Sequence, residues 1–177
     1  WLLAIYPFYH TKLFPDSKLH NEKYDVIQDE GHTNSIEKAY ICAMPGAAQI
    51  SPGDIVVMYR TSDGKGPAEF RSVATSTCTL IRIRRKRDFS SSDDFITQVS
   101  PISVFRKDEL HTWWKRRQFY CLEMLYNFAF NRRVIRKNLI ETIGIPRHAR
   151  PDVLSLSTRQ LKDLLILGEV NERYYIH

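Results

Sequence analysis

Residues 51–60 are the part of the sequence that most narrows the choice of fold. Residues 51–54 (Ser-Pro-Gly-Asp) have the composition of a tight turn, and residues 55–60 (Ile-Val-Val-Met-Tyr-Arg) follow as an uninterrupted strand pattern. Alternation places the odd-numbered side chains of this strand on one face and the even-numbered ones on the other. After a hairpin-like loop over 61–67, residues 70–85 are rich in β-branched side chains and predict one long or bent strand.

The remaining apolar runs extend this sheet and add helices. Further strands are expected over 2–6, 39–44, 119–130 and 174–176, and helices over 107–117, 134–143 and 158–167. The last helix begins at a capping box, Ser157 to Gln160, and ends at Gly168. The connecting segments are a turn or short helix at 14–17, a long surface loop over 21–38 and a loop over 90–94.

This order predicts an α+β fold: a small, mostly antiparallel β-barrel of five to six strands flanked by helices. No linker is long enough to split the chain, so residues 1–177 are expected to form a single domain. Because the chain begins at Trp1 rather than Met, we expect this domain to have been excised from a longer protein.

Several classes of protein are excluded by composition. The three cysteines (Cys42, Cys78 and Cys121) lie far apart with no Cys/His cluster, so neither a disulfide framework nor a metal site is expected and a cytoplasmic location is favoured. The longest apolar run is far shorter than the roughly 18 to 20 residues that span a bilayer. Nucleotide-binding and hydrolase signatures such as GxGxxG and GxSxG are absent, so no cofactor is predicted.

The positive charge is concentrated in two segments. Residues 82–87 carry five basic and no acidic side chains, and residues 106–137 carry nine basic and three acidic ones. Together they hold a charge of +11, whereas the rest of the chain holds −5. Such polarisation favours a polyanionic partner, RNA or DNA, although two solvated faces would give the same counts.

Residues 50–85 resemble the PUA-like superfamily, which includes EVE, YTH and ASCH domains. In these families a Gly-Asp turn, here Gly53-Asp54, begins a strand that ends in an aromatic residue, and the next strand crosses the barrel. Residues 1–7 (Trp-Leu-Leu-Ala-Ile-Tyr-Pro) are similar to the opening strand. Residues 9–16 do not match the Gly-x-Lys-x-x-Glu-x-Arg motif of ASCH domains, which favours an EVE-like module. Residues 10–17 are similar to PUA-like modules attached to acetyltransferase-type domains, which implies a fused catalytic domain.

The resemblance to EVE and YTH domains implies a pocket for a flipped-out base, modified or unmodified. Candidates by position follow the first and third strands or lie on the helix over 107–117: Tyr6, Phe8, His10, Tyr59, Arg60, Thr61, Ser62, Trp113 and Trp114. Tyr59 is equally suited to the core. Because Trp113 and Trp114 are adjacent, at most one of them is expected to contact a ligand.

The basic segments are then expected to bind phosphates rather than bases. The candidates are Arg82, Arg84, Lys86, Lys115, Arg116, Arg117, Arg132 and Arg133. Alternation puts Arg82, Arg84 and Lys86 on one face of their strand and Ile81 and Ile83 on the other. This strand is therefore expected to bury its isoleucines and expose its basic side chains.

Three functions remain open at this point. The favoured one is a non-enzymatic module that binds RNA or DNA. The second is an ASCH-like ribonuclease or nucleobase hydrolase that uses His10, Thr11, Lys12 or a nearby acid, which requires a perturbed pKa in the pocket. The third is a regulatory or interaction domain, with no pocket and an exposed apolar patch near residues 119–130.

Overall fold

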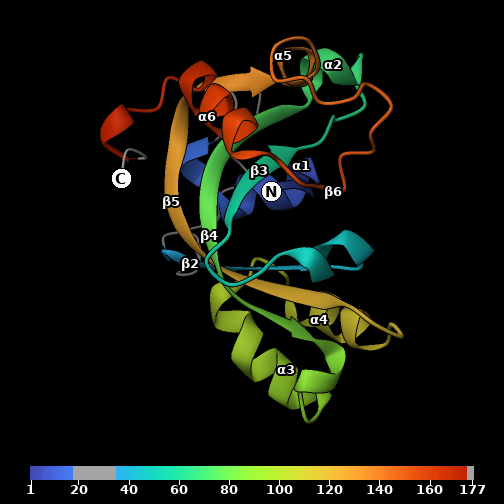
Figure 1. Cartoon of the computed structure of the whole chain (residues 1–177). Coiled ribbons are helices and arrows are strands. Elements are labelled where there is room, and N and C mark those ends of the chain that lie inside the picture. Colours follow the sequence, from blue (N-terminus) through green and yellow to red (C-terminus); the bar gives the residue numbers. More distant parts are fainter. Residues whose placement is uncertain (18–34, 175–177) are drawn as a thin grey trace.

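The computed structural model describes residues 1–17 and 35–174, and these form a curled sheet with helices at both ends (Figure 1). Six strands are described: β1 (Leu2–Ile5), β2 (Glu37–Cys42), β3 (Ile55–Arg60), β4 (Val73–Arg85), β5 (Tyr120–Ile135) and β6 (Val153–Leu154). Their order in the sheet is β2-β5-β4-β3-β1-β6. The pairing of β1 with β3 is parallel, and the other four pairings are antiparallel.

The two longest strands give the sheet its curvature. β4 and β5 pair with three register shifts, between Ala74 and Ser76, between Thr77 and Cys78, and between Leu80 and Arg82. Each shift bends and twists the strand pair locally. The curl brings β1 and β2 into one core cluster, to which β1 contributes Leu3 and Ile5 and β2 contributes Tyr40 and Ile41. The predicted α+β fold with a mostly antiparallel barrel is confirmed, as a half-barrel of six strands.

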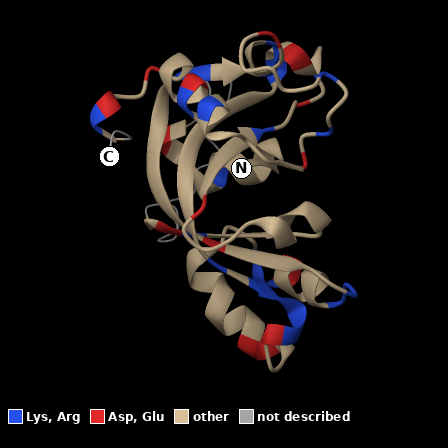
Figure 2. Ribbon diagram, in the orientation of Figure 1, with Lys and Arg blue, Asp and Glu red and all other residues tan. Residues whose placement is uncertain are grey.

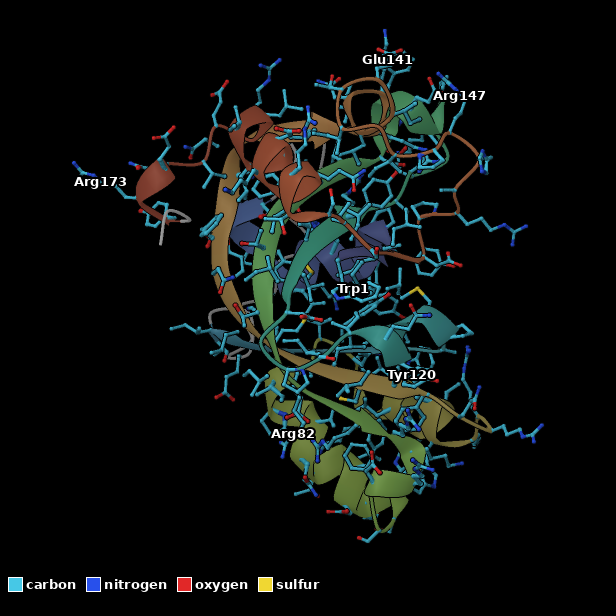
Figure 3. The ribbon with its side chains drawn as sticks, in the orientation of Figure 1. Trp1, Arg82, Tyr120, Glu141, Arg147 and Arg173 are labelled. Atoms are coloured by element: carbon cyan, nitrogen blue, oxygen red, sulfur yellow. The ribbon has the colours of Figure 1, made fainter. Side chains whose placement is uncertain are left out.

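Six α-helices of the described residues surround the sheet: α1 (Pro7–Leu13), α2 (Ala68–Arg71), α3 (Ser92–Val99), α4 (Lys107–Trp114), α5 (Arg136–Glu141) and α6 (Thr158–Leu167). α3 and α4 lie together at one end of the sheet, and α2, α5 and α6 lie at the other (Figure 1). Figure 3 shows the same two ends, with Arg82 at the first and Glu141 and Arg147 at the second. None of the helices of residues 1–17 and 35–174 is long and apolar enough to span a membrane.

β3 is buried on both faces, in the alternation expected from the sequence. Val56 and Met58 belong to the core cluster enclosed by the curl, whereas Val57 and Tyr59 belong to a second cluster on the opposite face. Phe130 of β5 joins the second cluster together with Leu164 and Leu165 of α6. The capping box of α6 is also as predicted, because Ser157 Oγ accepts a hydrogen bond from the Gln160 amide at 3.2 Å.

Three helices correct the predicted elements. α2 covers Ala68–Arg71, so the strand predicted over 70–85 begins only at Val73. α1 forms where no helix was expected, since Pro7 begins a helix at N1 rather than only ending a strand. α3 begins within the predicted loop over 90–94, at Ser92, because Ser91 is its N-cap and accepts a hydrogen bond from the Asp94 amide at 3.1 Å. The short 3₁₀ turn Pro15–Ser17 agrees with the turn or short helix expected at 14–17.

Several other elements begin or end at residues that differ from the predicted ones. β5 continues to Ile135, so the helix predicted from residue 134 begins only at Arg136. The strand predicted over 174–176 is wrong at Tyr174, which ends a 3₁₀ turn, and its other residues lie outside the described part. The predicted loop over 21–38 is wrong at Glu37 and Lys38, which begin β2, while residues 21–34 are not among those described.

The predicted exposure of the basic end of β4 is wrong at Ile81 and Arg84, whereas the exposed Arg82 and the half-buried Ile83, which packs against the core, agree with it. The Ile81 side chain is exposed, whereas Arg84 is buried and forms an ion pair with the buried Glu123. Arg82 donates two hydrogen bonds to the same carboxylate, at 2.6 and 3.0 Å. The register shift between Leu80 and Arg82 breaks the simple alternation on which the prediction depended.

Candidate functional site

A cavity of about 690 Å³ opens where the two edges of the curled sheet approach each other beside α4. Ala4 of β1 and Ile41 of β2 both line it, although β3, β4 and β5 separate these two strands in the sheet. Most of its large side chains are aromatic: Tyr6, Tyr9, Tyr40, Phe105 and Trp113. We refer to this cavity as the aromatic pocket.

Phe105 connects the rings of the aromatic pocket. Its ring centroid lies 4.5 Å from that of Tyr9, 6.1 Å from that of Tyr40 and 6.1 Å from that of Trp113, which it meets edge to face. Phe105 is itself buried, and mutual contacts of this kind hold rings in fixed orientations. The pocket therefore presents a preformed aromatic wall that suits a flat ligand.

The hydroxyl of Tyr9 is fixed by α4. It donates to Glu109 Oε1 at 2.9 Å, while Oε2 of the same carboxylate accepts from the Arg106 amide at 2.9 Å and caps the helix. Burial, and next to it the bond to Glu109, raises the pKa of Tyr9 to about 12. Tyr9 consequently remains a neutral phenol at physiological pH, with its ring held against Phe105.

Acidic side chains outnumber basic ones in the lining of the aromatic pocket. Asp108, Glu109 and Asp152 line it together with a single cationic residue, Arg116. Asp108 pairs with Arg106 at 3.0 and 3.1 Å, and these bonds lower the pKa of that carboxyl. Arg106 also lies 3.9 Å from Glu109, so the pocket has little net charge and suits an uncharged ring better than a phosphate.

Arg116 joins the pocket to a basic surface. Its guanidinium lies 4.2 Å from the Trp113 ring centroid, and the residue also lines an adjoining open depression of about 620 Å³ with Ala43, Arg117 and Gln118. Lys86 Nζ donates to the Arg116 carbonyl at 2.9 Å, which brings the end of β4 beside the end of α4. Both of these segments contain Lys and Arg residues, which are blue in Figure 2. We call Lys86, Arg116 and Arg117 the basic ridge.

The residues predicted for a base pocket divide into several groups. Tyr6, Thr61 and Trp113 line the aromatic pocket. Phe8 lies just outside it, since its ring is edge to face with Tyr9 at 5.3 Å. Ser62 is not part of the lining, and Trp114 instead stacks on Phe95 of α3 with 5.8 Å between centroids.

His10, Tyr59 and Arg60 are buried and do not line the pocket. His10 Nε2 is 2.7 Å from Thr75 Oγ1 of β4, and burial, followed by the charges of Arg60 and Arg133, lowers the pKa of His10 to about 3. Tyr59 packs in the core cluster on the other face of the sheet. Its alternative assignment to the core is therefore the one that the packing supports.

The eight predicted phosphate contacts do not form one track. Lys86, Arg116 and Arg117 make up the basic ridge, and Lys115 is exposed beside it. Arg82 and Arg84 are engaged by Glu123. Arg132 instead pairs with Glu169 at 3.7 Å, and Arg133 donates to the carbonyls of Phe130 and Asp16.

The residues named for enzymatic chemistry do not line the aromatic pocket. Thr11 Oγ1 donates to the Pro7 carbonyl at 3.0 Å, and Lys12 lies over the Phe8 ring. The one cysteine of the pocket lining is Cys42, and burial raises the pKa of its thiol to about 11, which leaves it protonated near neutral pH. Among residues 1–17 and 35–174, no three His, Cys, Asp or Glu side chains are placed to hold a metal ion.

Comparison with solved structures identifies the fold. An ASCH protein from Zymomonas mobilis superposes with a TM-score of 0.59 and 10% identity, over 94% of this chain and 93% of that one. Two variants of the same protein give TM-scores of 0.60 and 0.61 at 9% identity. Neither protein-family models nor curated proteins give a match. ASCH domains belong to the PUA-like superfamily, so the predicted PUA-like fold is confirmed, while the preference for an EVE-like module stays a prediction.

Proposed function

We propose that this PUA-like fold serves as a nucleic-acid-binding module: the aromatic pocket takes one unstacked base and the basic ridge binds the adjoining phosphates. The single observation that carries the proposal is the position of Arg116, which lines the aromatic pocket and the open depression beside it. A base in the pocket would have its phosphate next to Arg116 and Arg117. A lining that suits uncharged rings agrees with this arrangement, in which the pocket binds the base and the basic ridge binds the phosphates.

For such a ligand, the free-energy cost of unstacking the base and the gain from stacking it in the pocket are of similar size. Removing a base from its stack costs a few kcal/mol, and stacking on an aromatic side chain returns about 1–3 kcal/mol per base. The rings of the pocket are already in contact with one another, so little further ordering accompanies binding. Phosphate contacts on the basic ridge add affinity without sequence preference.

The test measures binding of labelled single- and double-stranded RNA and DNA by fluorescence anisotropy at low salt. Replacing Trp113 by Leu removes an aromatic wall but keeps apolar volume, and we expect affinity for the best ligand to fall about tenfold. Tyr174→Leu is the matched control, because this exposed ring stacks on Phe128 and neither residue lines the pocket. Equal affinities of the two variants would contradict the base pocket.

The basic ridge is tested separately by charge removal. Arg116→Gln should weaken binding several-fold and reduce its salt dependence, since one phosphate contact is lost. Arg159→Gln removes an equivalent charge from α6, where Arg159 pairs with Asp163 at the opposite end of the sheet, and should leave affinity unchanged. Absence of binding by the unmodified protein to any of the four nucleic acids at low salt would refute the proposed function as a whole.

A further inference from the structure

We propose that the nucleotide next to the pocketed base stacks on Phe8, with Lys12 on its phosphate, so that the ligand is a single-stranded segment of two or more nucleotides crossing α1. The inference deepens the proposed function and rests on it. Phe8 and Lys12 do not belong to the pocket lining, and Phe8 leaves half of its side chain exposed beside it.

Phe8 is placed one ring beyond the aromatic pocket. Its side chain is 51% exposed, whereas its neighbour Tyr9 turns inward to line the pocket. The two ring centroids are 5.3 Å apart with an angle of 77° between the planes. Tyr6, 68% exposed, lies at the pocket on the same stretch of chain. An exposed ring next to the aromatic wall can stack with the base that precedes or follows the base in the pocket.

Lys12 supplies the charge that such a platform needs. It lies one helical turn after Phe8 on α1, and its ammonium is 4.8 Å from the Phe8 ring centroid. A base that stacks on this ring replaces the ammonium, and the flexible lysine side chain then reaches the phosphate of the same nucleotide. Ring and cation together match the two parts of a nucleotide.

The cations on the two sides of the pocket define a path for the ligand. Lys12 and Phe8 lie on α1, while Trp113 lies on α4 and Arg116 follows that helix. The acidic lining residues Asp108 and Glu109 also belong to α4. A backbone that crosses the mouth keeps its phosphates on the cationic sides and one base inside. In a duplex, base pairing and stacking oppose the exposure of two neighbouring bases, so the single strand is the expected form.

The chain contains a matched control for this platform. Phe70 of α2 is 55% exposed, and Lys137 of α5 lies over its ring at 5.8 Å. Phe70 and Lys137 are the same two residue types as Phe8 and Lys12, and the two rings are exposed to a similar extent. Phe70 and Lys137, however, belong to elements at the end of the sheet away from α4 (Figure 1). Any general effect of losing an exposed aromatic side chain should appear equally in both places.

The experiment compares a mononucleotide with a labelled pentanucleotide of the same base, as RNA and as DNA. Phe8→Ala should weaken pentanucleotide binding about tenfold and leave mononucleotide binding unchanged, and Phe70→Ala should change neither. Lys12→Gln should lower the salt slope for the pentanucleotide by about 0.7, and Lys137→Gln should not. Both rings are exposed, so unchanged melting temperatures are expected to show that the variants fold.

Two results overturn the inference alone: an unchanged pentanucleotide affinity for Phe8→Ala, or an equal loss for Phe70→Ala. In both cases a loss of mononucleotide binding in Trp113→Leu would still support the base pocket. If neither probe binds the unmodified protein, the proposed function fails and this inference fails with it.

Discussion

At the scale of single residues, His10 shows how a local conformation decides whether a side chain faces a ligand or the core. By their position after the first strand, Tyr6, Phe8 and His10 were predicted to belong to a base pocket. Because α1 is a helix, Tyr9 instead faces the pocket and His10 faces Thr75 of β4. Tyr9 was missed for this reason, although a helical spacing of three from Tyr6 would have indicated it.

The burial of His10 predicts a pH dependence of stability. The lowered folded-state pKa of about 3, against about 6.5 when unfolded, means that its contribution is present above pH 6.5 and is lost as the pH falls towards 3. Between pH 7 and pH 5 this loss amounts to about 2 kcal/mol, because the unfolded chain alone binds the proton.

Urea denaturation at the two pH values measures that loss. His10→Gln should lose about 2 kcal/mol less than the unmodified protein, and His148→Gln, at an exposed position, should behave like the unmodified protein. An identical pH dependence in all three proteins would show that burial of His10 does not depress its pKa.

At the scale of the elements, Glu123 connects β4, β5 and α3. Its buried carboxylate on β5 pairs with Arg82 and Arg84 of β4, and Arg84 also donates to Gln98 of α3. A buried charge that loses its partner carries the full cost of its desolvation. The basic segment that the sequence offered as a phosphate track thus serves in part to hold the sheet and a helix together.

Removal of this carboxylate should be costly. Glu123→Gln is expected to lower the free energy of unfolding by about 3 kcal/mol, because Arg84 stays buried without a counter-charge. Asp163→Asn breaks the exposed pair with Arg159 and should cost less than about 1 kcal/mol. Urea denaturation at pH 7 compares them, and equal costs would mean that the buried triad contributes no more than a surface pair.

Local signals account for the elements that the sequence predicted well. β3 agrees at both ends because a turn precedes it and a loop follows it, and α6 agrees because of its capping box. α3 was missed because its N-cap lies among serines that are equally typical of a loop. β6 is only two residues long, and its pairing with β1 depends on the folded sheet rather than on any local pattern.

The candidate site was harder to predict than the fold. Tyr40 and Phe105 line the pocket only because the sheet curls and brings β2 and the segment before α4 together. Their positions in the sequence, far from Tyr6 and from each other, contain no sign of this. Trp113 was found because its helix has a regular apolar face, and Thr61 because it follows a clear strand.

At the scale of the whole molecule, the charge map is more divided than the sequence suggested. Arg132 and Arg133 are bound at the α6 end of the sheet, to Glu169 and to backbone carbonyls, whereas the basic ridge lies at the α4 end. Only the second group adjoins the aromatic pocket. We therefore expect only a few of the basic side chains to contact the phosphates of one polyanion.

This division predicts a moderate salt dependence. With about four phosphate contacts, from Lys12 and the basic ridge, the slope of log K against log salt should be about −3 for a single strand. Arg117→Gln should reduce its magnitude by about 0.7, while Arg132→Gln should leave it unchanged. Titrations at several salt concentrations measure the slope, and an effect of Arg132→Gln equal to that of Arg117→Gln would contradict the separation of the two groups.

The composition of the pocket wall has a consequence for how this protein can be dissected. Ala4, Tyr40, Trp113 and Asp152 all contribute to one cavity, so its wall draws on almost the entire length of the chain. A fragment that lacks either terminal third would lose a side of the cavity. Truncation mapping, the usual route to a minimal binding region, would abolish binding from both directions and locate the site nowhere.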